Sequence, residues 1–102
     1  MAVISLTKDN FNREVMECAT KVLIDFYADW CGPCQMVSPL VDEIAGERQD
    51  IKVCKVNVDE QPALAQAFRV TSIPMLAVVK NGKLVQHAVG ARPKADILAL
   101  LQ

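Results

Sequence analysis

The chain has 102 residues, 11 basic and 12 acidic side chains, a formal net charge of −1, and 52% hydrophobic residues. A chain of this length buries enough surface to fold as one domain, 1–102, without a metal or disulfide staple. Its near-neutral charge excludes nucleic acid or an anionic membrane as the expected main partner. Apolar runs such as 75–79 are far shorter than the ~18 residues that span a bilayer. The first residues do not match a secretory signal, so we expect a cytoplasmic protein.

The first predicted elements are a short strand and a helix. Residues 3–6 are predicted as the strand. Thr7 or Asp9 can cap the helix, because both residue types accept hydrogen bonds from the free N–H groups at a helix start. Apolar residues then recur at helical spacing, which predicts that they face the core. These residues are Phe11, Val15, Cys18 and Ala19.

A strand and a proline-containing helix come next. Residues 22–27 form a nearly continuous apolar run, which is typical of a strand covered on both faces in a parallel sheet. Gly32 and Pro33 then precede a helix predicted over residues 34–45. Pro39 lies inside that helix and should kink it, because proline lacks an N–H group and clashes with the preceding turn.

A third strand and a short helix follow. Residues 51–58 are predicted as the strand. The helix should run through Phe68, with Asp59 as its N-cap and Pro62 in its first turn. The chain therefore alternates between strands and helices up to this point.

The last third of the chain carries a hairpin and a closing helix. Residues 75–79 and 83–89 are predicted as antiparallel strands, because Asn81-Gly82 between them is a strong hairpin signal. An amphipathic helix starts at Pro93 and carries Ile97, Leu98 and Leu101. These elements predict an α/β fold, in which helices cover both faces of a mixed sheet with an antiparallel edge.

Two of the four cysteines form a C-x-x-C motif at a predicted strand-to-helix junction. Cys31 and Cys34 fall on one face of the first helical turn, with Cβ atoms about 5–6 Å apart, close to disulfide geometry. The positive end of the helix should lower the pKa of the Cys31 thiol and favour its attacking form. Pro33 suits a first turn, and Gly32 keeps that turn tight.

The alternative for this motif is half of a zinc site. Its other ligands would be Cys18 and Cys54, each of which stands alone in the sequence, whereas zinc sites usually supply a second close pair. We therefore favour redox chemistry, and we interpret Cys18 and Cys54 as small buried hydrophobic residues.

Two charged residues lie within predicted strands. Asp25 interrupts residues 22–27 and Lys55 lies within 51–58, where a charge covered on both faces needs a partner. We expect each to be the partner of the other. Burial should raise the pKa of Asp25, which would suit it to exchange a proton with Cys34. The alternative is a purely structural ion pair.

Two further residues were weighed as site candidates. The spacing of Ile73-Pro74 before a predicted strand leaves open whether the peptide bond is cis or trans. His87, the only histidine, lies in the predicted hairpin far from the cysteines in sequence, and we interpret it as a surface residue.

The sequence resembles the thioredoxin family over essentially its whole length. Trp30-Cys31-Gly32-Pro33-Cys34 matches the active-site motif of that family residue for residue, and other segments fall where thioredoxins have their counterparts. These segments are 22–26, 73–74, 80–82 and 89–90. The resemblance implies a five-stranded mixed sheet flanked by four helices, and a general protein disulfide reductase.

The resemblance also implies catalytic roles within the motif and near it. Cys31 is similar to the exposed nucleophile that forms a mixed disulfide with a target, and Cys34 to the resolving thiol, with Gly32 and Pro33 between them. Asp25 resembles the buried family aspartate that assists the resolving thiol, and Lys55 its lysine neighbour, which would modulate the aspartate.

The resemblance further implies a shallow rim that binds target proteins. Pro74 matches a cis-proline beside the cysteines, where the backbone near Ile73 pairs with an extended target segment. Trp30, Gly90 and Ala91 would complete this rim. No metal or cofactor would be bound. Electrons would come from a thioredoxin reductase, either NADPH-linked or ferredoxin-linked, and pass to disulfide-containing proteins, with the chain acting as a monomer.

Three residues depart from the commonest family pattern: Tyr27, Gln35 and Met75. Gln35 stands where a basic residue is frequent, so we hypothesise a slightly higher pKa for the Cys31 thiol. Two rival functions were weighed. An oxidant or isomerase is disfavoured by Gly-Pro between the cysteines, and a binding module with an incidental dithiol by the presence of Asp25 and Pro74.

Overall fold

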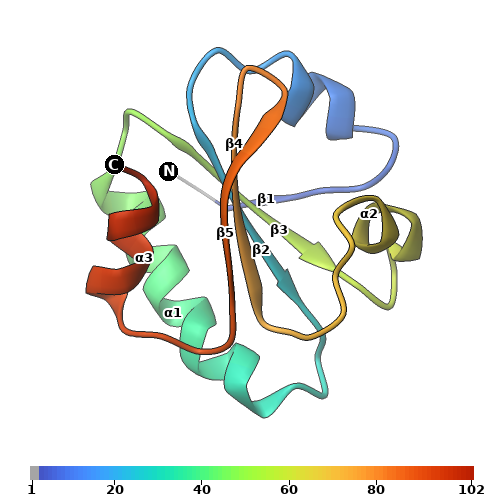
Figure 1. Cartoon of the computed structure of the whole chain (residues 1–102), viewed down its shortest axis with the longest axis vertical. Helices are drawn as coiled ribbons and strands as arrows, with labels where there is room; N and C mark the ends of the chain where they lie inside the picture. Colours follow the sequence, from blue (N-terminus) through green and yellow to red (C-terminus); the bar gives the residue numbers. More distant parts are fainter. Residues whose placement is uncertain (1–2) are drawn as a thin grey trace.

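The computed structural model describes residues 3–102, which form one five-stranded sheet in the order β1-β3-β2-β4-β5 (Figure 1). β1, β3 and β2 are mutually parallel, while β4 is antiparallel to β2 and β5 to β4. The strands are β1 (Ile4–Ser5), β2 (Val22–Tyr27), β3 (Lys52–Asn57), β4 (Met75–Lys80) and β5 (Lys83–Val89). The predicted mixed sheet with an antiparallel edge is confirmed.

Helical segments flank both faces of this sheet (Figure 1). Two of them, α1 (Gly32–Glu47) and α3 (Lys94–Leu100), lie on one face. A short π-helical segment, η1 (Asn12–Met16), and α2 (Pro62–Ala67) lie on the other. Within residues 3–102, no helix combines the length and apolar character needed to cross a bilayer.

The core consists of two apolar clusters, one on each face of the sheet. Side chains alternate between the two faces along a strand. Leu23 of β2 packs on the side of α1 and α3, whereas Val22, Ile24 and Phe26 pack on the side of η1 and α2. The Phe26 ring lies 5.0 Å from the ring of Phe68, between their centroids. β2 is therefore buried on both faces, as its apolar run predicts.

Helix α1 begins earlier than predicted, at Gly32, with Pro33 in its first turn. Proline fits there because the first N–H groups of a helix have no partner within the helix. The helix continues through Pro39 to Glu47. Its early start makes Cys31 the N-cap residue, which places the C-x-x-C motif at the end of the helix where backbone N–H groups are free.

The first predicted helix is shorter than its apolar pattern. η1 ends at Met16, so Cys18 and Ala19 lie beyond it, and they are half-buried and exposed respectively. The prediction that Ala19 faces the core was wrong, because the backbone leaves the helix before the repeat reaches it. Cys18 still packs against the core from its margin, with its Sγ atom 3.2 Å from the hydroxyl of Thr20.

The hairpin forms at the residues that predict it. Asn81 and Gly82 have φ angles of 53° and 74° between β4 and β5, and two consecutive positive φ angles match the tightest hairpin turns. β5 pairs only with β4 and lies at the edge of the sheet. Its side chains are mostly exposed, including the expected surface residue His87.

Candidate active site

Cys31 and Cys34 form a disulfide at the start of α1, with their Cα atoms 5.3 Å apart. Cys31 caps the helix, because its Sγ atom accepts a hydrogen bond from the N–H group of Cys34 at 3.2 Å. The N-terminus of a helix carries a partial positive charge that stabilises a thiolate. The disulfide therefore lies where the helix N-terminus would stabilise the thiolate of Cys31 once the disulfide is reduced.

The disulfide is more buried than the sequence suggests. Cys31 is 4% exposed and Cys34 is 3% exposed, so the expectation of an exposed Cys31 was wrong for the disulfide form. The two cysteines pack against Ala28 and against three half-buried side chains: Tyr27, Val58 and Ile73. Gly32 and Pro33, between the cysteines, are exposed.

The segment before β4 lies directly against the disulfide. The Ile73-Pro74 peptide bond is cis, whereas the sequence spacing alone left open whether it is cis or trans. The Sγ atom of Cys31 is 3.8 Å from the carbonyl oxygen of Ile73. The N–H group of Gly90 donates a hydrogen bond to the carbonyl oxygen of Pro74 at 2.8 Å. The end of β5 is thus brought to the same place, with Ala91 exposed next to Gly90.

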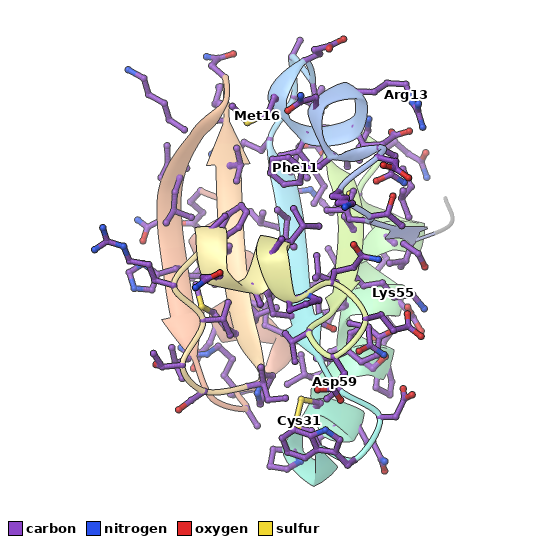
Figure 2. The ribbon with its side chains drawn as sticks, turned by 90° about the vertical axis from the view of Figure 1, so that its right-hand side faces the viewer. Phe11, Arg13, Met16, Cys31, Lys55 and Asp59 are labelled. Atoms are coloured by element: carbon purple, nitrogen blue, oxygen red, sulfur yellow. A yellow bond between two sulfur atoms is a disulfide. The ribbon has the colours of Figure 1, made fainter. Side chains whose placement is uncertain are left out.

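Trp30 stands out from the surface beside this disulfide. Trp30 is 71% exposed. Its indole Nε1 donates a hydrogen bond to Oδ2 of Asp59 at 2.8 Å. Figure 2 shows Asp59 close to Cys31 at one end of the molecule. The prediction of Asp59 as the N-cap of α2 was wrong: Gln61 precedes the helix, and the carboxylate of Asp59 is used to hold the indole.

The position of Asp59 depends on Asn57, the last residue of β3. Asn57 is buried, and its Oδ1 atom accepts hydrogen bonds from the N–H groups of Asp59 and Glu60 at 3.0 and 3.2 Å. Asn57 was not among the site residues predicted from the sequence. An asparagine side chain that bonds the backbone two residues on is a known turn device, so an asparagine at the end of a predicted strand was the available signal.

A hollow of about 350 Å³ opens beside the disulfide. Trp30 and Ile73, two residues predicted for the target rim, line it together with Val58. The remaining lining comes from Ala65 of α2 and from three residues between α2 and β4: Val70, Thr71 and Ser72. Because Val58 and Ile73 also pack against Cys31 and Cys34, the hollow and the disulfide share part of their walls.

Asp25 lies buried in the middle of β2. It faces α1, because it is two residues from Leu23 and pairs across the sheet with Leu76, both members of the cluster under α1. Its Oδ1 atom has no hydrogen-bond partner within residues 3–102. Burial raises its pKa to about 7. The predicted rise is confirmed, because removal from water disfavours the charged form.

Two other charges act on the Asp25 carboxyl. The carboxylate of Asp42, on α1, adds to the rise of its pKa, and the Lys55 ammonium opposes that rise. Asp42 was missed by the sequence analysis, because only the docking of α1 on the sheet brings it within range. Lys55 was singled out correctly as a charge that acts on Asp25.

Lys55 occupies the register position paired with Asp25, on β3. Its ammonium lies 5.9 Å from the centre of the Tyr27 ring, a distance at which the face of an aromatic ring attracts a cation. Within residues 3–102, no ion pair joins Lys55 to Asp25. The expectation of a direct ion pair was wrong, and the ammonium lies over the aromatic ring instead.

The two other cysteines stand apart from this chemistry. Cys54 is fully buried, and burial raises the pKa of its thiol to about 12. This confirms its interpretation as a small hydrophobic residue, whereas Cys18 is only half-buried. In the part of the chain from Val3 onward, no three His, Cys, Asp or Glu side chains gather as a metal site. The half zinc site with Cys18 and Cys54 is not formed.

Gln35 is exposed on the first turn of α1, and its amide donates a hydrogen bond to the carbonyl oxygen of Asp29 at 3.4 Å. Met75 is buried directly after Pro74. The third departure, Tyr27, packs against Cys31 and Cys34. All three departures therefore belong to segments that hold or adjoin the disulfide.

Comparison with known proteins identifies the family. The family model described as Thioredoxin matches residues 2–102. Thioredoxin 1 of Synechococcus elongatus is 48% identical over 94 residues, which cover 91% of this chain and 88% of that protein. Thioredoxin 1 of a Nostoc species is 45% identical over 102 residues, covering 99% of this chain and 95% of the relative. The M-type chloroplastic thioredoxin of Chlamydomonas reinhardtii is 43% identical over 96% of this chain and 71% of its own length.

These likenesses agree with the site. A disulfide caps a helix within a five-stranded mixed sheet, and the family model extends over every described element. The chain belongs to the thioredoxin family and is a thiol-disulfide oxidoreductase that acts by dithiol-disulfide exchange through Cys31 and Cys34.

Proposed function

We propose that residues 1–102 act as one monomeric thioredoxin unit, which reduces disulfides of other proteins and is itself reduced by a thioredoxin reductase. The observation that carries the proposal is the placement of the Cys31–Cys34 disulfide at the N-terminus of α1, against Ile73. This placement combines an activated sulfur with an open backbone segment. A disulfide reductase needs both features.

In the first step, the thiolate of reduced Cys31 attacks one sulfur of a target disulfide. A bond forms between Cys31 and the target, and the second target sulfur leaves as a thiolate that takes a proton from solvent. The helix N-terminus stabilises the attacking thiolate. The backbone near the half-buried Ile73 would support the target segment that carries the reacting sulfur, because extended backbone pairs with extended backbone.

In the second step, Cys34 resolves the mixed disulfide. Its thiol gives a proton to the Asp25 carboxylate, and its sulfur attacks the Sγ atom of Cys31. The bond between Cys31 and the target breaks, the target sulfur leaves as a thiolate that takes a proton from solvent, and the Cys31–Cys34 disulfide forms. The target has then gained two electrons, which the chain has lost. The raised pKa of Asp25, about 7, supports this role, because a group that takes and returns a proton works best near the working pH.

The remaining predicted residues have supporting roles in this proposal. Lys55 limits the rise of the Asp25 pKa. Gly32 and Pro33 shape the turn between the sulfurs. Trp30 and Ile73 line the hollow that would receive target side chains. Pro74, Gly90 and Ala91 would extend the target rim from Ile73, and the Gly90 to Pro74 hydrogen bond holds the end of β5 there.

The electron source and compartment complete the proposal. The chain would bind no cofactor and would take two electrons per cycle from a thioredoxin reductase, NADPH-linked or ferredoxin-linked. A disulfide reductase works where target disulfides are kept reduced, so we place the chain in the cytoplasm.

The test is a coupled assay in which a thioredoxin reductase, NADPH and insulin are mixed with the protein. Wild-type protein should catalyse insulin reduction, Cys31→Ser should abolish it, and Cys34→Ser should accumulate a mixed disulfide through Cys31. Cys18→Ser and Cys54→Ser are the matched controls and should retain activity. Insulin reduction that survives Cys31→Ser would overturn the mechanism. A protein that oxidises reduced peptides faster than it reduces insulin would instead favour an oxidant.

A further inference from the structure

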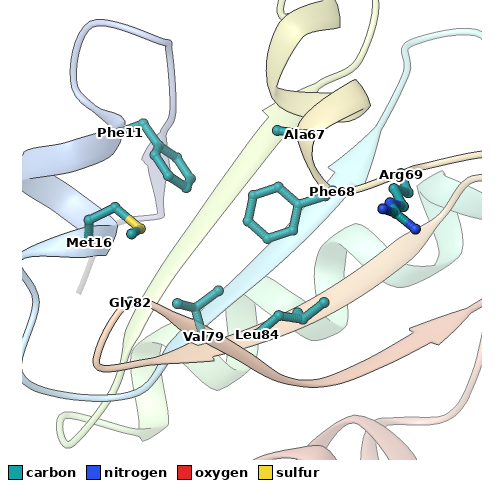
Figure 3. A pocket seen from close by; sticks show the side chains of 8 residues that line it. All are labelled: Phe11, Met16, Ala67, Phe68, Arg69, Val79, Gly82 and Leu84. Carbon is teal, nitrogen blue, oxygen red and sulfur yellow. The ribbon is translucent and has the colours of Figure 1, made fainter.

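An apolar hollow lies at the far end of the molecule from the disulfide, between η1, α2 and the β4–β5 hairpin (Figure 3). Its volume is about 350 Å³. The rings of Phe11 and Phe68 lie at its wall, 5.8 Å apart between centroids. In Figure 2, Phe11 and Met16 lie at the opposite end from Cys31. The catalytic chemistry proposed above does not use this hollow.

A second hollow, of about 280 Å³, continues from the first along β5. The two share Phe68, Arg69 and Leu84 as lining residues. The second hollow extends to Val89, the last residue of β5. We call the two hollows together the β5 groove. Because Gly90 follows Val89 and bonds to Pro74, the groove starts at the target rim and runs to the hairpin.

The β5 groove leaves large apolar side chains exposed. Met16 is 45% exposed, Leu84 is 47% exposed and Val89 is 48% exposed. These three residues lie along the groove from its hairpin end to its rim end. Contiguous exposed apolar surface of this kind marks an interaction site more often than it marks free surface.

The lining of the groove carries one positive charge. Arg69 lines both hollows, and neither hollow is lined by an Asp or Glu. A cation without an acidic neighbour in the lining favours acidic partners at this groove.

Arg69 is held in an unusual backbone conformation. Its φ angle is 55°, just after the end of α2, where its N–H group donates to the carbonyl oxygen of Gln66 at 3.0 Å. Glycine is the usual residue at such a position. Within residues 3–102 the Arg69 guanidinium forms no ion pair. An exposed cation thus stands over an apolar groove, at a position where a side chain is disfavoured.

We propose that the β5 groove is a second docking surface for target proteins, and that its occupant is an extended target segment with alternating apolar and acidic side chains, next in sequence to the reacting cysteine. The proposal rests on the reductase function above. Apolar side chains would cover Leu84 and Phe68, and a carboxylate would pair with Arg69. β5 has seven residues, so the segment would be about as long, at ~3.4 Å per residue.

The binding test uses oxidised protein and peptides without cysteine, so that no chemistry is involved. The acidic peptide contains a segment in which apolar residues (Val or Leu) alternate with acidic residues (Glu or Asp), joined to Ser-Gly. Its basic twin has Lys in place of every acidic residue. Each peptide is made in two versions, one with the alternating segment before Ser-Gly and one with it after Ser-Gly. The acidic peptide should bind about tenfold tighter than its twin and shift the NMR amide signals of β5. Equal affinities of the two peptides would overturn the proposal.

Variants of Arg69 and Leu84 locate the binding. Arg69→Gly suits the positive φ and should weaken binding of the acidic peptide about fivefold, Arg69→Glu should weaken it further, and Arg69→Lys should retain most of it. Leu84→Ala should weaken it several-fold. The matched controls are Val85→Ala, a neighbour that is 49% exposed but lines neither hollow, and Arg48→Glu, which follows α1 on the other face.

A kinetic test separates this proposal from the proposed function. Disulfide-linked peptides with and without the acidic segment are reduced by the reduced protein. Faster reduction of the flanked peptide by wild type, but not by Arg69→Glu, supports the groove. Failure to reduce either peptide contradicts the reductase function, and the binding test still decides the groove. If controls and groove variants weaken binding equally, or if sedimentation shows a second copy of the chain paired at β5, the docking proposal is wrong.

Discussion

Asp25 and Lys55 occupy paired positions on β2 and β3, yet the Lys55 ammonium lies over the Tyr27 ring, 5.9 Å from its centre. The Asp25 carboxyl is left buried, with Oδ1 unpaired within residues 3–102. An ionised carboxylate in such a place opposes folding, because no neighbouring group replaces the water it loses. Two predictions concern the protonation of this one residue.

The first prediction is that Asp25→Asn removes a pH-dependent loss of stability. The folded-state pKa of Asp25, about 7, is above its ordinary value of 3.8, so the fold favours the protonated form. The stabilisation from protonation is complete below about pH 4 and is lost as the pH rises through about 7, by roughly 4 kcal/mol in total. Urea unfolding of the disulfide form from pH 4 to pH 8 measures it.

The control for that experiment is Asp29→Asn, which changes an exposed carboxylate. The free energy of unfolding of this control should follow the wild-type pH profile. Asp25→Asn should gain stability relative to wild type as the pH rises. Parallel profiles for Asp25→Asn and wild type would contradict the raised pKa.

The second prediction is that two neighbouring charges shift the Asp25 pKa in opposite directions. Lys55→Gln should raise it further, because the ammonium opposes the rise, and Asp42→Asn should lower it, because the Asp42 carboxylate adds to the rise. NMR titration of the Asp25 carboxyl carbon in the disulfide form measures both shifts. Shifts of the same sign would exclude the proposed arrangement of charges.

The third prediction concerns the hydrogen bond between Trp30 and Asp59. Asp59→Ala should leave the indole without its 2.8 Å partner and should raise KM for protein disulfides about threefold to tenfold, as expected for the loss of one such bond. The kcat for a small disulfide should stay unchanged.

Trp30 is the only tryptophan of the chain, so its fluorescence reports the change in its surroundings directly. Glu60→Ala is the matched control, since Glu60 is equally exposed and only its backbone is bonded to Asn57. An unaltered emission spectrum and KM in Asp59→Ala would show that the bond does not position Trp30.

The fourth prediction is that Cys54 resists alkylation while the protein is folded. Burial raises the pKa of its thiol from the ordinary 9.0 to about 12, which lowers the thiolate fraction about a thousandfold at neutral pH. Iodoacetamide applied to the disulfide form should modify the half-buried Cys18 first, and Cys54 only after unfolding. Mass spectrometry of the peptides checks this order, and rapid modification of Cys54 in the folded protein would contradict its burial.

The elements of the fold could be predicted where local signals and tertiary packing agree. The apolar run 22–27 requires cover on both faces, and the observed clusters supply it. Asn81-Gly82 fits only a tight turn, and the hairpin forms there. The helical pattern failed at Ala19, because η1 ends at Met16, a boundary that apolar spacing does not encode.

The disulfide pair could also be predicted, because its two residues are three positions apart and local geometry fixes their separation. The contacts that surround the pair could not. The Trp30 to Asp59 hydrogen bond joins residues 29 positions apart, and the influence of Asp42 on Asp25 needs α1 docked on the sheet. The sequence favours two partners for the Lys55 ammonium equally well, the Tyr27 ring and the Asp25 carboxylate, so it does not predict which of them the lysine contacts.

The buried amide of Asn57 separates two properties that an evolving redox protein must adjust. The sulfur chemistry depends on β2 and the first turn of α1, whereas Asn57 fixes the turn after β3, and through Asp59 the direction of the Trp30 indole. A change at Asn57 would alter which proteins are received and leave the reacting atoms in place. Under the proposed function, the choice of target proteins would therefore depend on residues that take no part in the sulfur chemistry, and each property could diverge without the other.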